Sequence, residues 1–108
     1  MLPQNFTTKS QEALQIAHQY ALQHGQQALE PLHLFFALLE QEDGVVPAIL
    51  KKLAVRLPVL KTEIEELVLQ LPKINGGGGL AQIYLAPAMI KVLLNAERAA
   101  KHFKDEYI

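Results

Sequence analysis

Apolar residues recur with a helical period along most of the chain, and no segment alternates between apolar and polar residues in the way that predicts a strand. The clearest pattern predicts a helix over residues 8–24. Thr7 or Thr8 is its expected N-cap, with Gln11 in the capping-box position of Thr8, and Gly25 is expected to end it. The predicted buried face consists of Ala13, Leu14, Ala17, Tyr20 and Ala21.

A second helix is expected to start at Pro31, because proline at the first helical position loses no hydrogen bond and already has a helical φ. Only His33 interrupts the apolar residues over 32–39, so this short helix has almost no polar face. We therefore expect it at the centre of a small bundle. The pair Asp43-Gly44 predicts a turn after it.

Two more helices are predicted before a break in the pattern. Residues 46–53 form the third, with Ile49, Leu50 and Leu53 facing inward, and the fourth starts at Pro58 and is closed by Pro72. The apolar positions of the fourth helix are Leu60, Ile64, Leu67, Val68 and Leu71, and its outer side carries Glu63, Glu65 and Glu66.

The break is a run of four glycines after Asn75, which has no side chains to bury and predicts a flexible linker. A phosphate-binding loop is the alternative, but neither Lys-Ser nor Lys-Thr follows the glycines and no strand precedes them. We therefore interpret residues 72–84 as a linker.

A fifth helix is predicted over residues 87–103, and its apolar register repeats that of the first. A shift of 79 positions brings Phe6 onto Leu85, Ala13 onto Val92, Leu14 onto Leu93, Ala17 onto Ala96, Ala21 onto Ala100 and Leu29 onto Ile108. Such a match is typical of an internal duplication. The helix's predicted inner stripe is Ile90, Leu93, Ala96, Ala100 and Phe103.

The duplication predicts one all-α domain, a small helical bundle of two imperfect repeats. Residues 1–71 form the first repeat with four helices, 72–84 the glycine-rich linker, and 85–108 the first helix of a truncated second repeat. We expect the fifth helix to pack back on the first repeat, or to be covered in a dimer or swapped dimer of the chain.

Composition and charge exclude several classes of partner. The 108 residues include ten Lys and Arg against eleven Asp and Glu, a net charge of −1, so no basic surface for nucleic acid or anionic membrane is expected. Cysteine is absent, which excludes disulfides and thiolate chemistry. The N-terminus has no basic leader, and the longest apolar run, residues 34–39, is far too short to span a bilayer. We expect a soluble, cytoplasmic protein.

Metal and catalytic sites are also disfavoured. His18 and His24 are six residues apart, about 120° around a helix, so they do not share a face. His33 is expected to be satisfied by a backbone partner in the apolar second helix, and zinc is disfavoured. Adjacent carboxylates such as Glu65 and Glu66 point apart on a helix, so no catalytic residue is predicted.

Several short segments occur together in a particular order: Phe6-Thr7-Thr8-Lys9, then Glu30-Pro31-Leu32-His33-Leu34, then residues 37–44, then Leu71-Pro72-Lys73 before the glycines, then Tyr84-Leu85, and finally Asp105-Glu106-Tyr107-Ile108. Together they resemble the N-terminal Clp repeat domain of the ClpB disaggregases. The resemblance covers essentially the whole chain.

The resemblance implies a mobile domain of a hexameric, ATP-driven unfoldase that works with a DnaK-type chaperone on aggregated polypeptide. The chain contains no Gly-x-x-x-x-Gly-Lys-Thr motif, so we expect a non-catalytic domain without a cofactor, with ATP and Mg²⁺ belonging to separate ATPase domains. The family's N-domain is taken to bind unfolded segments in an apolar groove near the junction of the repeats. By resemblance, Thr7 and Asp105 lie at its rim.

A receptor for unfolded chains needs apolar surface with little geometric demand, and the fifth helix offers Met89, Ile90 and Leu93 for it. These three residues have a second interpretation as core, just as Thr7 is first a helix cap and Asp105 a loop or cap residue. The predicted polypeptide-binding residues are thus Thr7, Asp105, Met89, Ile90 and Leu93.

Two other functions remain open from the sequence. One is an adaptor-docking N-domain of a ClpA- or ClpC-type protease regulator, which would recognise one folded partner. The other is a structural module that modulates assembly of the hexamer. Competition by many unrelated apolar peptides is expected for a substrate site, by one partner only for an adaptor site, and no peptide binding for the structural module.

Overall fold

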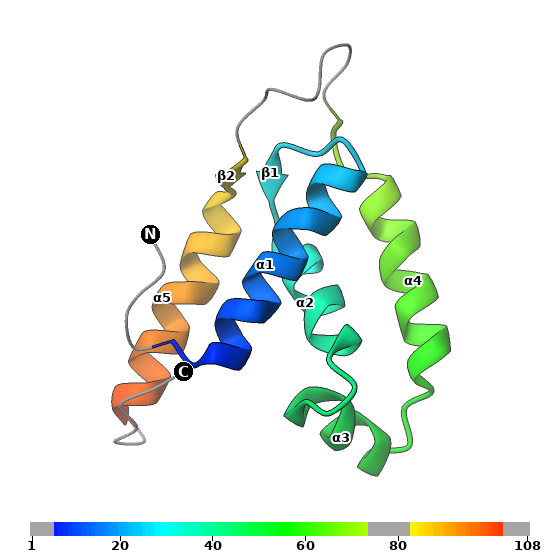
Figure 1. Cartoon of the computed structure of the whole chain (residues 1–108), viewed down its shortest axis with the longest axis vertical. Coiled ribbons are helices and arrows are strands. Elements are labelled where there is room, and N and C mark those ends of the chain that lie inside the picture. Colours follow the sequence, from blue (N-terminus) through cyan, green and yellow to red (C-terminus); the bar gives the residue numbers. More distant parts are fainter. Residues whose placement is uncertain (1–5, 74–82, 103–108) are drawn as a thin grey trace.

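Helices dominate the structure, a computed structural model that describes residues 6–73 and 83–102. The fold class predicted from the sequence, an all-α bundle, is confirmed. In chain order the elements within these two ranges are α1 (Thr8–Gln23), β1 (Ala28–Leu29), α2 (Pro31–Glu40), α3 (Val45–Lys52), α4 (Leu57–Leu69), β2 (Tyr84–Leu85) and α5 (Pro87–His102). As Figure 1 shows, α1 lies between α5 and α4, and α3 closes the lower end of the bundle.

Thr7 is the N-cap of α1, one of the two candidates that the sequence offers. Its Oγ1 accepts a hydrogen bond from the Ser10 N–H at 3.1 Å, which satisfies a backbone donor in the first turn. Gln11 was predicted to complete a capping box, but its side-chain amide donates instead to the Phe6 carbonyl at 2.9 Å. The bond therefore fixes the chain that enters the helix.

Gly25 ends α1 as predicted, with a φ of 64° that glycine adopts without a steric penalty. Its N–H donates to the Leu22 carbonyl, and the N–H of Gln26 donates to the Ala21 carbonyl, both at 3.0 Å. This is the Schellman pattern of helix ends, and it turns the chain toward β1.

The predicted central position of α2 is confirmed, because this helix contacts α1, α3, α4 and α5. Pro31 stands at its first position and Glu30 is the N-cap. Ala37 and Leu39 are buried, whereas Phe35 and Glu40 are exposed. A helix with so little polar surface is stable only when neighbours surround it, as they do here.

The predicted orientation of α3 is correct for Leu50 but wrong for Ile49 and Leu53, which are 51% and 67% exposed. Val46 and Leu50 are one turn apart and meet the cluster formed by α1, α2 and α4. Pro47 is buried beside this face, whereas Val45, Ile49 and Leu53 on the other flank of the helix are exposed.

The inner face of α4 largely follows the prediction. Ile64 and Val68 are buried, and Leu60 and Leu71 pack beside them in the same cluster. Leu67 was predicted to face inward and is instead 48% exposed, because Ile64 and Val68 already define the face in contact with α2. The three predicted outer glutamates are exposed.

Two strands of two residues each were not predicted. β1 and β2 pair in parallel, with Ala28 opposite Tyr84 and Leu29 opposite Leu85. A strand of two residues is too short to show an alternation of apolar and polar residues, so the sequence does not predict it. The pairing brings the start of α5 beside the segment that joins α1 to α2 (Figure 1).

The position of α5 agrees with the predicted duplication register and with packing on the first repeat. Thr8 and Pro87, which begin α1 and α5, are 79 residues apart, and so are Gln23 and His102, which end them. Ala86, Met89 and Leu93 form one buried cluster with Phe6 and Leu14. The predicted inner position of Ile90 is wrong, because its side chain is 45% exposed. Residues 74–82 of the predicted linker and Phe103 lie outside the described ranges.

Candidate functional site

An apolar hollow of about 230 Å³ lies where α1, α2 and α5 meet. Small side chains on α1 and α5 leave the space, and larger ones from α2 form its wall. Ser10 contributes the single hydroxyl among the lining residues. The lining consists of Phe6, Ser10, Ala13, Leu14, Leu34, Leu38, Val92, Leu93 and Ala96.

A second hollow of about 340 Å³ lies next to the first and shares Ser10 and Leu38 with it. It extends between the start of α1 and the turn from α2 to α3, and its other lining residues are Thr7, Lys9, Gln41, Asp43, Gly44, Val45 and Val46. We call the two hollows together the apolar groove. One end is lined by apolar side chains apart from Ser10, and the other has a polar rim.

An exposed ion pair forms part of that rim. The Lys9 Nζ lies 2.9 Å from Asp43 Oδ1 and 3.0 Å from Asp43 Oδ2, and Gln41 Nε2 donates to the Lys9 carbonyl at 2.9 Å. The hydrogen bond to Lys9 lowers the pKa of the Asp43 carboxyl, and the same bond raises the pKa of the Lys9 ammonium. The rim thus joins the first turn of α1 to the turn after α2.

The sequence-predicted site residues do not all meet at this groove. Thr7 lines its polar end and Leu93 its apolar end. Met89 is fully buried in the core beneath, which is the second interpretation that the sequence left open. Ile90 lines neither hollow, and Asp105 lies outside the described residues.

Sequence reasoning missed lining residues on α1, α2, α3 and α5 and in the turn after α2. The sequence places the apolar helix of residues 32–39 at the centre of the bundle without singling out Leu34 or Leu38, and both line the groove. On α1 and α5 a signal was present: Ala13 and Val92 are related by the 79-residue register and line the groove from opposite helices.

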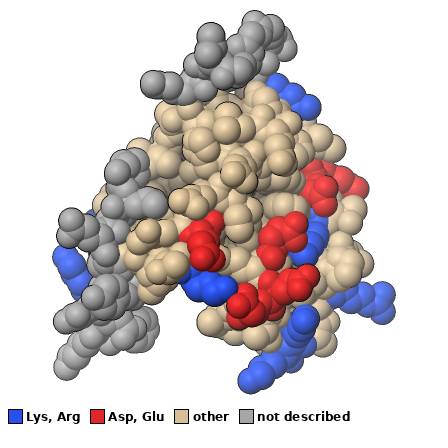
Figure 2. Space-filling model, in the orientation of Figure 1, with Lys and Arg blue, Asp and Glu red and all other residues tan. Residues whose placement is uncertain are grey.

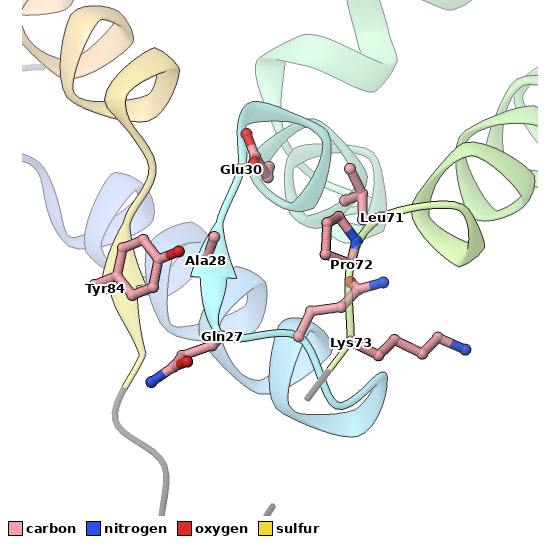
Figure 3. Close-up of a pocket in the computed structure, with 8 residues that line it drawn as sticks. Gln27, Ala28, Glu30, Leu71, Pro72, Lys73 and Tyr84 are labelled. Carbon is pink, nitrogen blue, oxygen red and sulfur yellow. The ribbon is translucent and has the colours of Figure 1, made fainter. Parts of the chain in front are cut away.

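A separate, more polar pocket of about 280 Å³ lies at the edge of β1. Figure 3 shows Tyr84 on one side of β1 and Pro72 on the other, with the Lys73 side chain extending away from the strand. Gln27, Ala28, Glu30, Leu71 and the buried Gln26 complete its lining.

Behind this pocket, His33 connects α2 to α4 through hydrogen bonds that include the side chain of Gln26. Its Nδ1 accepts from the Glu30 N–H at 2.9 Å, which confirms the predicted backbone partner. The proton is therefore on Nε2, which donates to Gln26 Oε1 at 2.7 Å, and Gln26 Nε2 donates to the Val68 carbonyl. Burial, and secondarily the charge of His24, lowers the pKa of His33.

The described residues offer neither a metal site nor a membrane-spanning helix. Among them, no group of three His, Cys, Asp or Glu side chains is suited to a metal ion. None of the described helices has the length and apolar character that crossing a bilayer requires. An apolar groove with one polar rim can hold apolar side chains of a ligand and hydrogen-bond its backbone.

Comparisons with known proteins agree on one family. The family model described as the Clp repeat (R) N-terminal domain matches residues 5–108. The chaperone protein ClpB of Clostridium tetani is 37% identical over 106 residues, covering 97% of this chain, and that of Bacillus anthracis is 36% identical over 103 residues, covering 94%. The chain spans about 12% of the length of these relatives.

Solved structures share the fold. The N-terminal domain (1–163) of the ClpV1 ATPase from the Sci1 T6SS of E. coli EAEC has a TM-score of 0.86 at 17% identity. The match covers 96% of this chain and 61% of that one. At this identity the likeness shows the shared fold alone.

Proposed function

Because the chain belongs to the Clp repeat N-terminal domain family, we propose that it is the substrate-recognition domain of a ClpB-type, ATP-dependent disaggregase. In this proposal the domain binds unfolded or aggregated polypeptide segments in the apolar groove. The observation that carries it is the groove itself, in which apolar side chains of three helices surround one open hollow.

The groove suits a ligand without a fixed order of side chains. Leu34, Leu38 and Val92 offer apolar surface with no directional demand, so many different apolar side chains can occupy the same space. At the other end Thr7 and Gln41 line the second hollow, and the side-chain oxygen of Gln41 can accept a hydrogen bond from an extended backbone. Binding is expected to be weak, because ordering a disordered ligand costs several kcal/mol.

The remaining assignments follow from the same proposal. The domain carries out no catalysis and holds no cofactor, while ATP and Mg²⁺ act in the ATPase domains of a longer, hexameric protein. A DnaK-type chaperone cooperates with that protein in the cytoplasm. Adaptor docking in the manner of ClpA or ClpC is not favoured, because both of the curated relatives above are named ClpB.

Two matched variants of α5 test the groove. Val92 and Ile90 are exposed to a similar extent, at 38% and 45%, but only Val92 lines the groove. Val92→Glu places a carboxylate among apolar side chains and is expected to weaken binding of a labelled, permanently unfolded protein by about tenfold or more. Ile90→Glu introduces the same charge on the same helix and is expected to change the affinity by less than about twofold.

Fluorescence anisotropy measures the two affinities, and circular dichroism verifies that both variants remain folded. Competition by several unrelated apolar peptides is expected for the unmodified chain. Equal losses in both variants would place the binding surface on the outer side of α5 and contradict the groove. The absence of any binding by the folded chain would favour the adaptor or structural alternatives.

A further inference from the structure

The outer side of α3 carries an apolar stripe that no described element covers. Val45, Ile49 and Leu53 are spaced by four residues, so they lie along one side of the helix, and each is more than half exposed. The adjacent side of the helix, about 100° around its axis, fills the core contact through Val46 and Leu50. The stripe is therefore surplus to what the bundle needs for its own packing.

Cations accompany this stripe. Lys52 lies beside Val45 and Ile49 on the helix surface, and Arg56 follows Leu53 by three residues in the turn to α4. Both side chains are exposed, and within residues 6–73 and 83–102 neither forms an ion pair. Figure 2 shows Lys and Arg side chains at the lower edge of the molecule, around α3.

The outer side of α4 has the complementary character. Val59, Glu63 and Glu66 follow one another at helical spacing, with Leu67 beside Glu63, and all four are exposed. Neither glutamate forms an ion pair with another described residue. This surface thus offers two carboxylates next to two exposed apolar side chains.

We infer that a second copy of the chain covers the α3 stripe with its α4 face. Ile49 and Leu53 pack there against Val59 and Leu67 of the second copy, and Lys52 and Arg56 face its Glu63 and Glu66. A two-fold arrangement makes this contact twice, because each copy supplies one α3 and one α4. The matching surface occurs on the same chain, so no other protein is required.

The pair should be weak and sensitive to salt. Two short helices from each copy bury less surface than the roughly 1,200 Å² at which specific interfaces begin. The contribution of the charges falls as ionic strength rises, because exposed pairs are screened. The contact uses a different surface from the groove, apart from Val45, which lines both.

Charge exchange tests the inference. Sedimentation velocity of the unmodified chain, at low salt and at concentrations up to the millimolar range, is expected to show a monomer–dimer equilibrium. The double variants Lys52→Glu/Arg56→Glu and Glu63→Lys/Glu66→Lys each place like charges opposite one another. Each is expected to associate at least about tenfold more weakly. An equimolar mixture of the two is expected to restore the dimer, because both contacts then pair opposite charges.

A matched control changes the same charges elsewhere. Lys91→Glu/Arg98→Glu alters two exposed cations of α5 and is expected to leave the association unchanged. A chain that stays monomeric at every concentration would overturn the inference. So would association that survives in both α3 and α4 variants, or that is lost in the α5 control, since the contact would then lie on another face.

Discussion

At the scale of single residues, His33 shows how one neutral side chain holds distant backbone together. Its imidazole receives the Glu30 N–H at the start of α2 and donates to Gln26, which in turn reaches the Val68 carbonyl near the end of α4. If Nδ1 were protonated, its N–H would point at the N–H of Glu30, and the hydrogen bond between them would be lost. The buried network therefore requires the neutral ring.

The free energy of unfolding is expected to fall as the pH drops below about 6.5, the ordinary histidine value. His33 has a lowered pKa in the folded chain, so the unfolded chain binds its proton first. Its contribution is complete above the unfolded pKa. It is lost as the pH falls toward the folded pKa, with a slope of at most about 1.4 kcal/mol per pH unit.

Urea unfolding at several pH values between about 5 and 7 measures this slope. His33→Gln removes the titrating group and is expected to flatten the curve in that window. His18→Gln, at an exposed position of α1, serves as the control, and we expect it to leave the slope of the unfolding free energy against pH unchanged. An unchanged slope in the His33 variant would show that the network does not control the acid sensitivity.

At the scale of elements, the sequence predicts all five helices but not every surface that they present. The sequence predicts the end of α1, because a glycine, Gly25, follows the helix. The chain leaves α3 with the same hydrogen-bond pattern, but the residue with positive φ there is an alanine, Ala54. In α3 the adjacent apolar residues Ile49 and Leu50 allow two inner faces, and the periodicity alone does not choose between them. The choice depends on where α2 and α4 lie.

Ala54 adopts a φ of 63°, which costs an alanine about 1–2 kcal/mol relative to the right-handed region. Its N–H donates to the Lys51 carbonyl and the Val55 N–H to the Leu50 carbonyl, both at 3.0 Å. Ala54→Gly removes the steric cost but increases the entropy of the unfolded chain. We expect a net stabilisation of about 0.5–1 kcal/mol in urea unfolding.

The matched control for this variant lies inside α3, the helix that Ala54 follows. Ala48 is exposed inside α3, and Ala48→Gly is expected to destabilise the chain by about 1 kcal/mol, because glycine disfavours helix interiors. Equal destabilisation by both variants would contradict the argument that Ala54 is strained.

At the scale of the whole molecule, the groove arises because α5 docks on α1 through Phe6, Leu14 and Leu93. The sequence supplied the duplication register and, through the family resemblance, the expectation of a groove at the junction. The sequence did not predict which residues of α2 line the groove. In a central helix every apolar residue is expected in the core, whether or not it borders a hollow. Thr7 and Leu93 were the two predicted site residues that line it.

The most direct test of the central claim is to map the binding surface by NMR on the isotopically labelled chain, titrated with an unlabelled, permanently unfolded protein. Our account predicts that the amide shifts change most at Ser10, Leu38, Val92 and Ala96, which line the groove from three helices. Shifts that change instead around Gln27, Ala28 and Tyr84, at the polar pocket, would contradict it.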